Sequence, residues 1–441
     1  MDRRTFLKTS AAAGAATFWG RTVFGAAEES PNYTVALVGT GWWGTNILRE
    51  AIWSKRVKVV ALCDVDESQL GKCAAEVQKL SGETPKHFKD FRQMLESAKP
   101  QIVICATPDH WHPLVTIAAV KAGAHVYVEK PISHTVKEGQ AMVKAAREAG
   151  RTVVVGTHRR VSPHNVAGRD FIRSGKAGKI GMIKCYVNYP GGGPEQPEEN
   201  AEPPKALDWD MWCGPGPLRP FNRKIHPKGF RQFLDYANGT TGDWGIHWLD
   251  QVLWIMDQKY PKSIYSTGGR PIKGKPVNDP QGQTTDAPDH QIAVYNFDGF
   301  DVYWEHRQFA GNQQDKSENV GCYFFGTNGV FHQGWKEGWT FYPSQGKKAP
   351  QHMDAQLHEP DQQNIRENWA DFVAAIKENR RPISDIEAVH LSTNLALLGV
   401  LSMKLGRSIQ WDGEKEQCVG DGEANTLLRR EYRAPWKYPE V

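Results

Sequence analysis

Continuously apolar runs alternate with segments of helical periodicity in the first third of the chain. The helical period is present at residues 68–81 and 136–148, where apolar positions recur three and four residues apart. Runs that are apolar at every position predict strands buried on both faces, and strands that alternate with helices form a parallel sheet with helices on both sides. The predicted strands span residues 33–38, 57–63, 102–106, 125–128 and 152–155. We therefore predict a doubly wound α/β domain over residues 32–156.

The remainder of the chain, residues 157–441, has a different pattern. Polar and apolar side chains alternate at residues 291–297 and 301–305, which predicts strands of an antiparallel or mixed sheet with one exposed face. Residues 188–221 are rich in Gly, Pro and Trp, which predicts a long functional loop and argues against regular helix. Two helices are expected, at residues 364–378 and 386–405. The second domain is therefore expected to be α+β with a large open sheet.

The composition is typical of a globular protein, with 39% hydrophobic and 24% charged residues. The net charge is +4, and most of the excess lies in residues 1–27, so the rest of the chain is nearly neutral. Nucleic-acid binding is not expected, because no basic stripe accompanies the aromatic residues. Beyond the N-terminus we find no stretch with the ~18 or more apolar residues of a spanning helix, and we expect no stable membrane insertion.

The N-terminus carries the most specific targeting signal in the sequence. Arg3 and Arg4 are followed by Phe-Leu-Lys and by a run of small apolar residues from Ala11 to Ala16, which resembles a twin-arginine signal peptide. Small residues at 25–27 would suit a signal peptidase. The alternative is a frayed basic helix. We expect residues 1–27 to direct export by the twin-arginine machinery to the periplasm.

The seven cysteines are odd in number and include no C-x-x-C pair, so neither a disulfide framework nor a zinc site is expected. Twin-arginine substrates generally cross the membrane folded, which suits buried reduced thiols and a cofactor loaded in the cytoplasm. His110 and His112 have no third ligand cluster at a suitable spacing. We therefore expect no metal.

The first predicted strand ends in a glycine-rich turn, Gly39-x-Gly41-x-x-Gly44. A helix follows, so backbone N–H groups and the helix dipole would face a pyrophosphate. Asp64 ends the second strand, where a carboxylate would accept hydrogen bonds from ribose hydroxyls and repel a 2′-phosphate. NAD is therefore favoured over NADP. The alternative is a structural turn in which Asp64 only caps the next helix.

Further motifs give a family resemblance. Together with the glycine turn they resemble the Gfo/Idh/MocA (glucose–fructose oxidoreductase / inositol dehydrogenase) family over nearly the whole chain, in its exported bacterial subgroup. The resemblance implies an α/β fold, with a Rossmann doubly wound parallel sheet followed by an α+β domain. The motifs are Thr107-Pro108-x-x-x-His112, Glu129-Lys130-Pro131, Arg159-Arg160, Trp209-x-x-Trp212-x-Gly-Pro, Asp243-x-x-x-His247 and Gly-Arg-x-Ile-x-Trp411.

The resemblance also implies the residues of the cofactor site. A lysine at the tip of a parallel strand lies in the crevice where α/β sheets bind ligands, so Lys130 is expected beside the nicotinamide, where its charge could stabilise an alkoxide. By resemblance, Arg160 lies near the nicotinamide end. The expected cofactor contacts are Gly39, Gly41, Trp42, Trp43, Gly44, Asp64, Thr107, Pro108, His112, Glu129, Lys130 and Arg160.

Asp243 and His247 are four residues apart and would share one helical face. A histidine there could take the proton of a substrate hydroxyl while the carboxylate orients the substrate. From spacing alone, a helix-capping aspartate and a core histidine would be the favoured interpretation. The family match favours Lys130, Asp243 and His247 as the catalytic residues.

The expected function is NAD(P)-dependent hydride transfer to or from a sugar or polyol hydroxyl, with the cofactor retained. Sixteen tryptophans suit stacking on sugar rings. Two alternatives are an NAD-dependent glycosidase that acts by transient oxidation and elimination, and a non-catalytic NAD-loaded binding protein. A dimer or tetramer is expected by resemblance. The expected substrate contacts are Lys130, Arg160, Tyr186, Trp209, Trp212, Arg231, Asp243 and His247.

Overall fold

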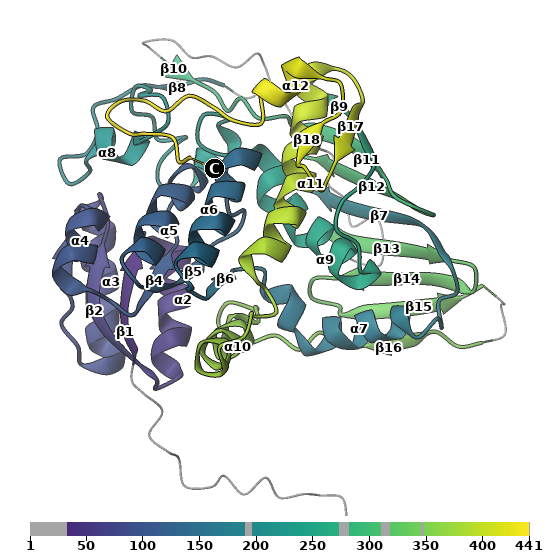
Figure 1. The fold of residues 1–441 in the computed structure, drawn as a ribbon, viewed down its shortest axis with the longest axis horizontal. Helices are drawn as coiled ribbons and strands as arrows, with labels where there is room; N and C mark the ends of the chain where they lie inside the picture. Colours follow the sequence, from purple (N-terminus) through teal and green to yellow (C-terminus); the bar gives the residue numbers. More distant parts are fainter. Residues whose placement is uncertain (1–32, 190–195, 273–281, 310–317, 345–347, 441) are drawn as a thin grey trace, which may run out of the picture. The chain divides into compact units, whose positions relative to one another are not determined.

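A computed structural model describes residues 33–189, 196–272, 282–309, 318–344 and 348–440. The predicted signal peptide therefore lies outside the described residues. The first part of the fold is a six-stranded, all-parallel sheet (Figure 1). In spatial order its strands are β3 (Lys86–Phe88), β2 (Val57–Cys63), β1 (Tyr33–Val38), β4 (Ile102–Cys105), β5 (His125–Val128) and β6 (Val153–Val155). This order confirms the predicted Rossmann sheet. The strands follow one another outward from β1 to β3 on one side and from β4 to β6 on the other, so the strand order reverses between β1 and β4.

Helices cover both faces of this sheet because its strands are apolar on both sides. One face packs against α4 (Phe91–Ala98), α5 (His112–Lys121) and α6 (Val136–Glu148). The other packs against α2 (Trp42–Trp53), α3 (Glu67–Ser81) and α10 (Ile365–Glu378). Helix α10, late in the sequence, thus returns to the first sheet. A first domain that ends at residue 156 does not include this helix.

The second sheet has ten strands and is mixed, as expected. Only the pair β7–β12 is parallel among the strand pairs of its described residues. In spatial order the strands are β16 (Gln351–Met353), β15 (Trp339–Pro343), β14 (Gly329–Gly334), β13 (Val320–Gly326), β7 (Ile180–Asn188), β12 (Asp301–Arg307), β11 (His290–Asn296), β9 (Ser263–Gly269), β17 (Ile409–Asp412) and β18 (Gln417–Cys418). One face forms a core with helices α7 (Pro163–Arg173), α9 (Ile246–Met256) and α11 (Ile386–Leu405).

Shorter elements join the two sheets. Trp209–Cys213 form helix α8, which corrects the expectation that this segment contains no regular helix. Asp208 makes the turn possible, because its side chain accepts a hydrogen bond from the Met211 N–H at 2.9 Å. The remaining elements are β8 (Glu198–Glu199), β10 (Gly282–Gln283), α12 (Gly422–Thr426), the 3-10 turns η1 (Asp109–Trp111), η2 (His158–Val161) and η3 (Gly229–Gln232), and the π-helical turn η4 (Thr241–Gly245).

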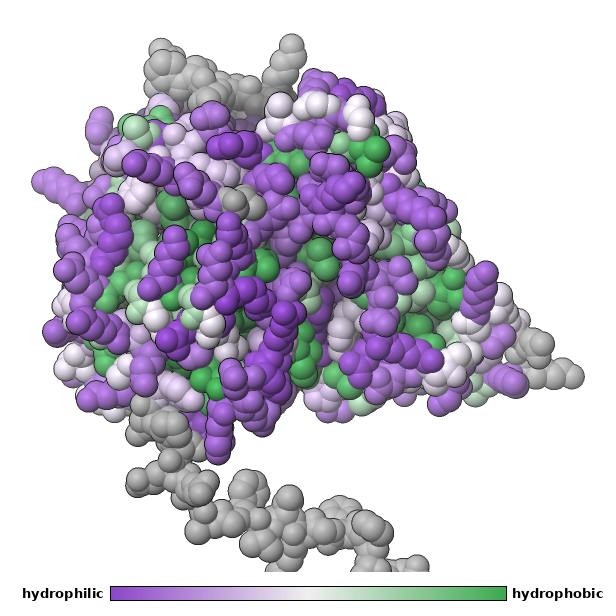
Figure 2. All heavy atoms as spheres, in the orientation of Figure 1, coloured by the Kyte–Doolittle hydropathy of each residue, from purple (hydrophilic) through white to green (hydrophobic). Residues whose placement is uncertain are grey.

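Helix α11 corrects a second expectation. By length and composition it could cross a membrane, although no such stretch was expected beyond the N-terminus. However, 72% of its apolar window is buried inside the protein, and it packs against α6, α9 and β9 (Figure 1). Hydrophilic side chains predominate on the face shown in Figure 2. The apolar character of α11 is accounted for by its place in the core.

Candidate active site

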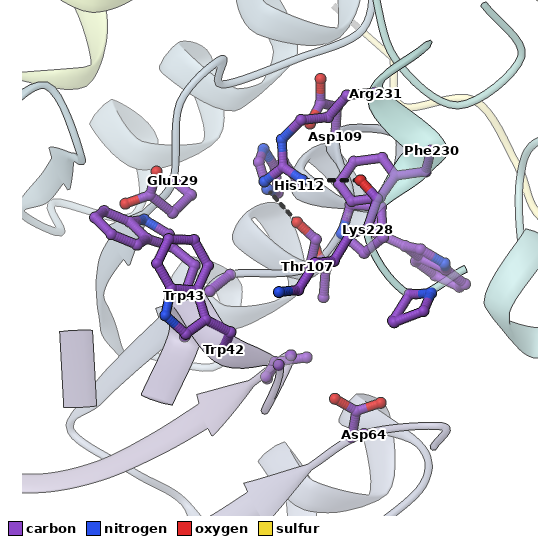
Figure 3. A pocket seen from close by; sticks show the side chains of 18 of the residues that line it. Trp42, Trp43, Asp64, Thr107, Asp109, His112, Glu129, Lys228, Phe230 and Arg231 are labelled. Atoms are coloured by element: carbon purple, nitrogen blue, oxygen red, sulfur yellow. Dashed lines mark hydrogen bonds between the residues drawn. The ribbon is translucent and has the colours of Figure 1, made fainter. Parts of the chain in front are cut away.

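A cleft runs along the carboxyl ends of the parallel strands. The segments that follow β1, β2, β4 and β5 form one wall, and residues from the second part of the fold form the other. Figure 3 shows Asp64 at one end of this cleft and Arg231 with Asp109 at the other. Open α/β sheets bind ligands at this edge, where the strand order reverses.

The glycine turn needs glycine for steric reasons. Gly39 has a φ of +91°, and a Cβ there would lie 2.5 Å from the Ala106 carbonyl oxygen. A Cβ on Gly44 would lie 2.1 Å from the Gly39 oxygen, so α2 can approach β1 only without one. A Cβ on Gly41 would meet nothing within 4 Å. The turn therefore leaves open space at the N-terminus of α2, as a bound pyrophosphate requires.

Asp64 is held rigidly at the end of β2. One carboxylate oxygen accepts hydrogen bonds from the Thr40 N–H at 2.6 Å and the Thr40 hydroxyl at 2.9 Å, and the other accepts from the Asp66 N–H at 2.9 Å. Burial raises the pKa of Asp64, and these hydrogen bonds oppose that rise. The carboxylate lines the cleft one strand away from the glycine turn, which fits an adenosine ribose.

Lys130, Asp243 and Arg231 form a charged cluster in the cleft. Lys130 Nζ donates to Asp243 Oδ1 at 2.8 Å and to the Asp243 backbone oxygen at 3.0 Å. Arg231 Nε donates to the same Oδ1 at 3.2 Å. Burial alone would raise the pKa of Asp243, but the two cations hold it below its usual value. Asp243 is therefore a carboxylate that positions Lys130.

Asp243 and His247 lie in one continuous helical stretch, since η4 runs directly into α9. Asp243 is inside this stretch rather than at its first residue, so it does not cap the helix. A π-helical turn is uncommon and often accompanies a functional site. The sequence predicted that both residues lie on one face of a regular α-helix. In the structure both side chains do line the cleft, but the helix makes a wider, π-helical turn between them.

His247 is enclosed by aromatic rings. Its imidazole centroid lies 5.1 Å from the ring of Trp335, 5.7 Å from Trp244 and 6.0 Å from His158. Nδ1 is buried and has no hydrogen-bond partner among the described residues. Burial lowers the pKa of His247 well below its usual value, and Lys130 and His158 lower it further. The imidazole is therefore neutral and can accept a proton.

Two further carboxyl groups are buried in the cleft. Burial raises the pKa of both Asp109 and Glu129 to about 7. Glu129 lies against the strand ends, where its Oε2 accepts from the Lys130 N–H at 3.1 Å and a Cβ on Gly156 would lie 2.2 Å from its Oε1. Asp109 lies on turn η1 after β4. No motif drew attention to Asp109, because it occupies an unassigned position between Pro108 and His112.

The loop after β4 is braced by His112. Its Nδ1 lies 2.8 Å from the Pro131 oxygen and its Nε2 lies 2.8 Å from the Thr107 oxygen. Burial lowers the pKa of His112 to about 4. Thr107, Pro108 and His112 line the cleft together with Trp42 and Trp43. His112 thus ties the end of β4 to the Lys130-Pro131 turn.

Residues 205–231, which we call the cover segment, cross from the second part of the fold onto the ends of β2 and β4. Met211, Trp212, His226, Lys228 and Phe230 line the cleft from this segment. Lys228 Nζ lies 5.7 Å from the ring centroid of Trp42. The cover segment also contacts the residues that follow β2. The Glu67 N–H donates to the Ala206 oxygen at 2.9 Å, and the Asp208 N–H donates to the Val65 oxygen at 3.0 Å. His226 Nε2 lies 3.0 Å from Asp66 Oδ2.

Three residues predicted for the site lie outside the cleft. Arg160 donates to the buried Asp250 carboxylate through Nε and Nη2, at 2.7–3.0 Å, so its charge is already paired. The Tyr186 hydroxyl lies 3.0 Å from His332 Nε2 within the ten-stranded sheet. Trp209 stacks on Trp212 at 4.6 Å and donates to the Arg219 oxygen. Trp212 does line the cleft, but beside His226 rather than beside Lys130.

All seven cysteines are buried and none is in a disulfide. Among the described residues, no three His, Cys, Asp or Glu side chains come together in a way that could hold a metal ion.

Comparison with known proteins defines the class. Residues 33–157 match the model of an oxidoreductase family with an NAD-binding Rossmann fold, and residues 189–438 match the C-terminal alpha/beta domain of the same family. The chain therefore belongs to the Gfo/Idh/MocA oxidoreductase family, as the sequence motifs predicted. Residues 1–18 match a twin-arginine translocation signal, which confirms the predicted type of signal sequence.

Individual relatives are distant. The chain is 27% identical over 213 residues to a glycosyl hydrolase family 109 protein of Stenotrophomonas maltophilia, covering 45% of this chain and 46% of that one. It is 30% identical over 149 residues to an inositol 2-dehydrogenase of Salmonella typhimurium, covering 33% and 43%. Both matches thus span less than half of the relative. The aldose-aldose oxidoreductase of Caulobacter crescentus, solved with glycerol, shares the fold at a TM-score of 0.63 and 18% identity, covering 86% and 99%.

Proposed function

We propose that this protein transfers hydride between a bound nicotinamide dinucleotide and a hydroxyl-bearing carbon of a sugar or polyol. One observation carries the proposal: Lys130, Asp243 and His247 meet in the cleft that the glycine turn and Asp64 also line. When bound, the nicotinamide ring supplies the hydride acceptor and donor. The residues present fit this group, because the turn leaves open space at the N-terminus of α2 and Asp64 is fixed nearby.

The side chains divide the remaining work. Lys130, held by Asp243, stabilises negative charge on the substrate oxygen. Neutral His247 takes the hydroxyl proton, and the enclosing rings exclude water from it. Asp243 keeps the ammonium group in place. A non-catalytic dinucleotide-binding protein would not need this arrangement of an acid, a base and a cation.

A carbohydrate substrate is supported by the aromatic side chains around His247. The ring centroids of Trp244 and Trp335 lie 5.3 Å apart. Both side chains line the cleft, and both contact His247. The apolar C–H face of a sugar ring packs well on such surfaces. These two tryptophans replace Trp209 and Tyr186 as the proposed wall, and Arg231 remains as a hydrogen-bond donor.

The function is tested by mixing the purified protein with NAD and a panel of methyl glucosides, free aldoses and inositols. Formation of reduced nicotinamide, or its oxidation by the corresponding ketones, is the expected result. If no member of the panel changes the nicotinamide absorbance in either direction, and none is converted to product, hydride transfer is refuted.

We further propose that NAD is preferred over NADP. The Asp64 carboxylate would repel a 2′-phosphate and accept hydrogen bonds from free ribose hydroxyls. Asp64→Ala is expected to weaken NAD binding about 10-fold or more, the loss of ~1.5–3 kcal/mol that accompanies a hydrogen bond to a charged group, and to improve the relative affinity for NADP. Binding titrations with both reduced cofactors measure this. Glu67→Ala, an exposed carboxylate on the next helix, is the control, and an unchanged NAD:NADP ratio in Asp64→Ala would contradict the assignment.

We also propose that the cofactor stays bound after export to the periplasm. No free nicotinamide dinucleotide pool is expected outside the cytoplasm, so a redox-neutral cycle needs a retained cofactor. The cover segment supports retention, because it contacts the segments that follow β2 and β4 and approaches Trp42. Two reactions fit such a redox-neutral, closed cycle: the transfer of hydride between two sugars, and a glycosidase reaction by oxidation, elimination and reduction.

We also expect this protein to form a homodimer or homotetramer.

Denaturing the purified exported protein is therefore expected to release close to one NAD(H) per chain. His226→Ala, which removes the contact with Asp66, is expected to lower the amount that survives dialysis, whereas His87→Ala on exposed β3 is not. An empty wild-type protein that binds added NAD reversibly would overturn retention while leaving hydride transfer open.

A further inference from the structure

The cleft contains a second acid that hydride transfer does not use. Asp109 is 5% exposed and lines the cleft from turn η1. Its carboxyl group forms no hydrogen bond or ion pair with a side chain in the described parts of the chain. This differs from Asp243, which two cations hold. A buried carboxyl group that no cation pairs directly is costly, so its position in the cleft calls for an explanation.

The charges around Asp109 suit proton exchange. Arg231 and Lys130 favour its carboxylate form, whereas Asp243 and burial favour the neutral acid, and burial raises its pKa to about 7. An acid of this kind can both take up and release a proton near neutral pH. Figure 3 shows Asp109 in the same part of the cleft as Arg231 and His112. Asp109 therefore faces the substrate side of the cleft.

The position of Asp109 differs from that of the other acid and base groups. His247 comes from helix α9 of the second part of the fold, whereas Asp109 follows strand β4 of the first. Glu129 also lines the cleft, but it lies at the strand ends, against Gly156 and the Lys130 N–H. Hydride transfer needs one base for the hydroxyl proton, which His247 supplies. Asp109 is thus available for a second proton on the same substrate.

We propose that Asp109 is the catalytic base that removes a proton from the carbon next to the oxidised carbon of the sugar. The inference rests on the proposed function, because a ketone must first form, with the bound nicotinamide dinucleotide as the oxidant. The C–H bond beside the ketone breaks, its proton passes to the Asp109 carboxylate, and its electron pair forms an enolate. Lys130 lies where it can stabilise the enolate oxygen.

An enolate allows the neighbouring carbon to lose its substituent. When that substituent is a glycosidic oxygen, the C–O bond breaks, the oxygen takes a proton from solvent and leaves as an alcohol, and an unsaturated ketone remains. The oxygen of a water molecule then adds at the same carbon and one of its protons returns to solvent. Asp109 returns its proton to the adjacent carbon, and hydride returns to the ketone. The net change is hydrolysis of one glycosidic bond with no net oxidation. The second acid therefore favours the glycosidase form of the closed cycle.

The test separates the two proton transfers. Wild-type protein is incubated in deuterated water with methyl glucosides, inositols and their ketone counterparts, and deuterium bound to carbon is measured by mass spectrometry. Reduction of the same ketones by added NADH is followed in parallel. Asp109→Asn is expected to lower carbon exchange ~100-fold or more relative to ketone reduction in the same variant. Asp109→Glu, which keeps the carboxyl group, is expected to restore part of the exchange.

The other results are equally decisive. If wild-type protein reduces the ketones but exchanges no carbon-bound hydrogen, or if Asp109→Asn lowers exchange and reduction by the same factor, Asp109 is not this base. Full exchange in Asp109→Asn also overturns the assignment. If wild-type protein neither reduces nor oxidises any probe, the proposed function itself fails, which is a distinguishable outcome.

Discussion

Replacing Lys130 by Met is expected to lower the rate of hydride transfer at least ~1,000-fold while leaving the dinucleotide bound. The ammonium group is the cation closest to Asp243 in the cleft, at 2.8 Å, and its loss removes the charge that stabilises the substrate oxygen. Single interactions of this kind contribute ~100- to 1,000-fold to catalysis, and the unpaired Asp243 carboxylate would oppose negative charge further. Single-turnover nicotinamide reduction measures the rate, and cofactor released on denaturation measures binding.

Lys137→Met is the matched control, since its ammonium donates to Gln140 on helix α6 and lies outside the cleft. It is expected to retain wild-type rates. Thermal unfolding of both variants shows whether the folds survive. Wild-type turnover in Lys130→Met would remove this residue from the catalytic set, and loss of bound dinucleotide in that variant would make its role one of cofactor binding.

The parallel sheet could be predicted from sequence because its signals are local. Every strand except the edge strand β3, which is polar and was not predicted, is a short apolar run. The glycine turn and Asp64 follow strands directly, so strand ends fix where these residues lie. Lys130 follows the same rule at the end of β5. For parallel strands, the carboxyl ends share one edge of the sheet, and sequence order is then enough to bring these residues together.

The other side of the cleft depends on contacts between distant residues. Arg160 was expected near the nicotinamide, but it pairs with Asp250, which lies 90 positions further along the chain. Trp335, which packs against His247, comes from the end of strand β14 and carries no motif. Similarly, α10 returns to the first sheet from residue 365. No local pattern encodes these pairings, so sequence alone could not identify them.

His247→Gln is expected to lower kcat/KM ~100- to 10,000-fold, the range of general base catalysis, and to remove the acidic limb of the pH profile. In the proposed mechanism His247 works as the neutral base. Burial lowers its pKa well below its usual value, so activity persists below the ordinary histidine pKa of about 6.5. It is then lost as pH falls through the lowered pKa, because the imidazole becomes protonated.

His87→Gln, an exposed histidine of β3, is the control and is expected to keep the wild-type profile. Rates are measured as initial velocities with a sugar that the function test identifies, across a pH range in which thermal unfolding shows both proteins folded. If His247→Gln keeps the acidic limb at the same pH, another group is the base, and Asp109 becomes the first residue to test. If the acidic limb of the wild-type pH profile instead lies near the ordinary histidine pKa, substrate binding changes the surroundings of His247 enough to raise its pKa back to that value. Because Lys130 has the largest effect of the charged groups that lower this pKa, Lys130→Met is then expected to move the acidic limb to higher pH, which links the two predictions.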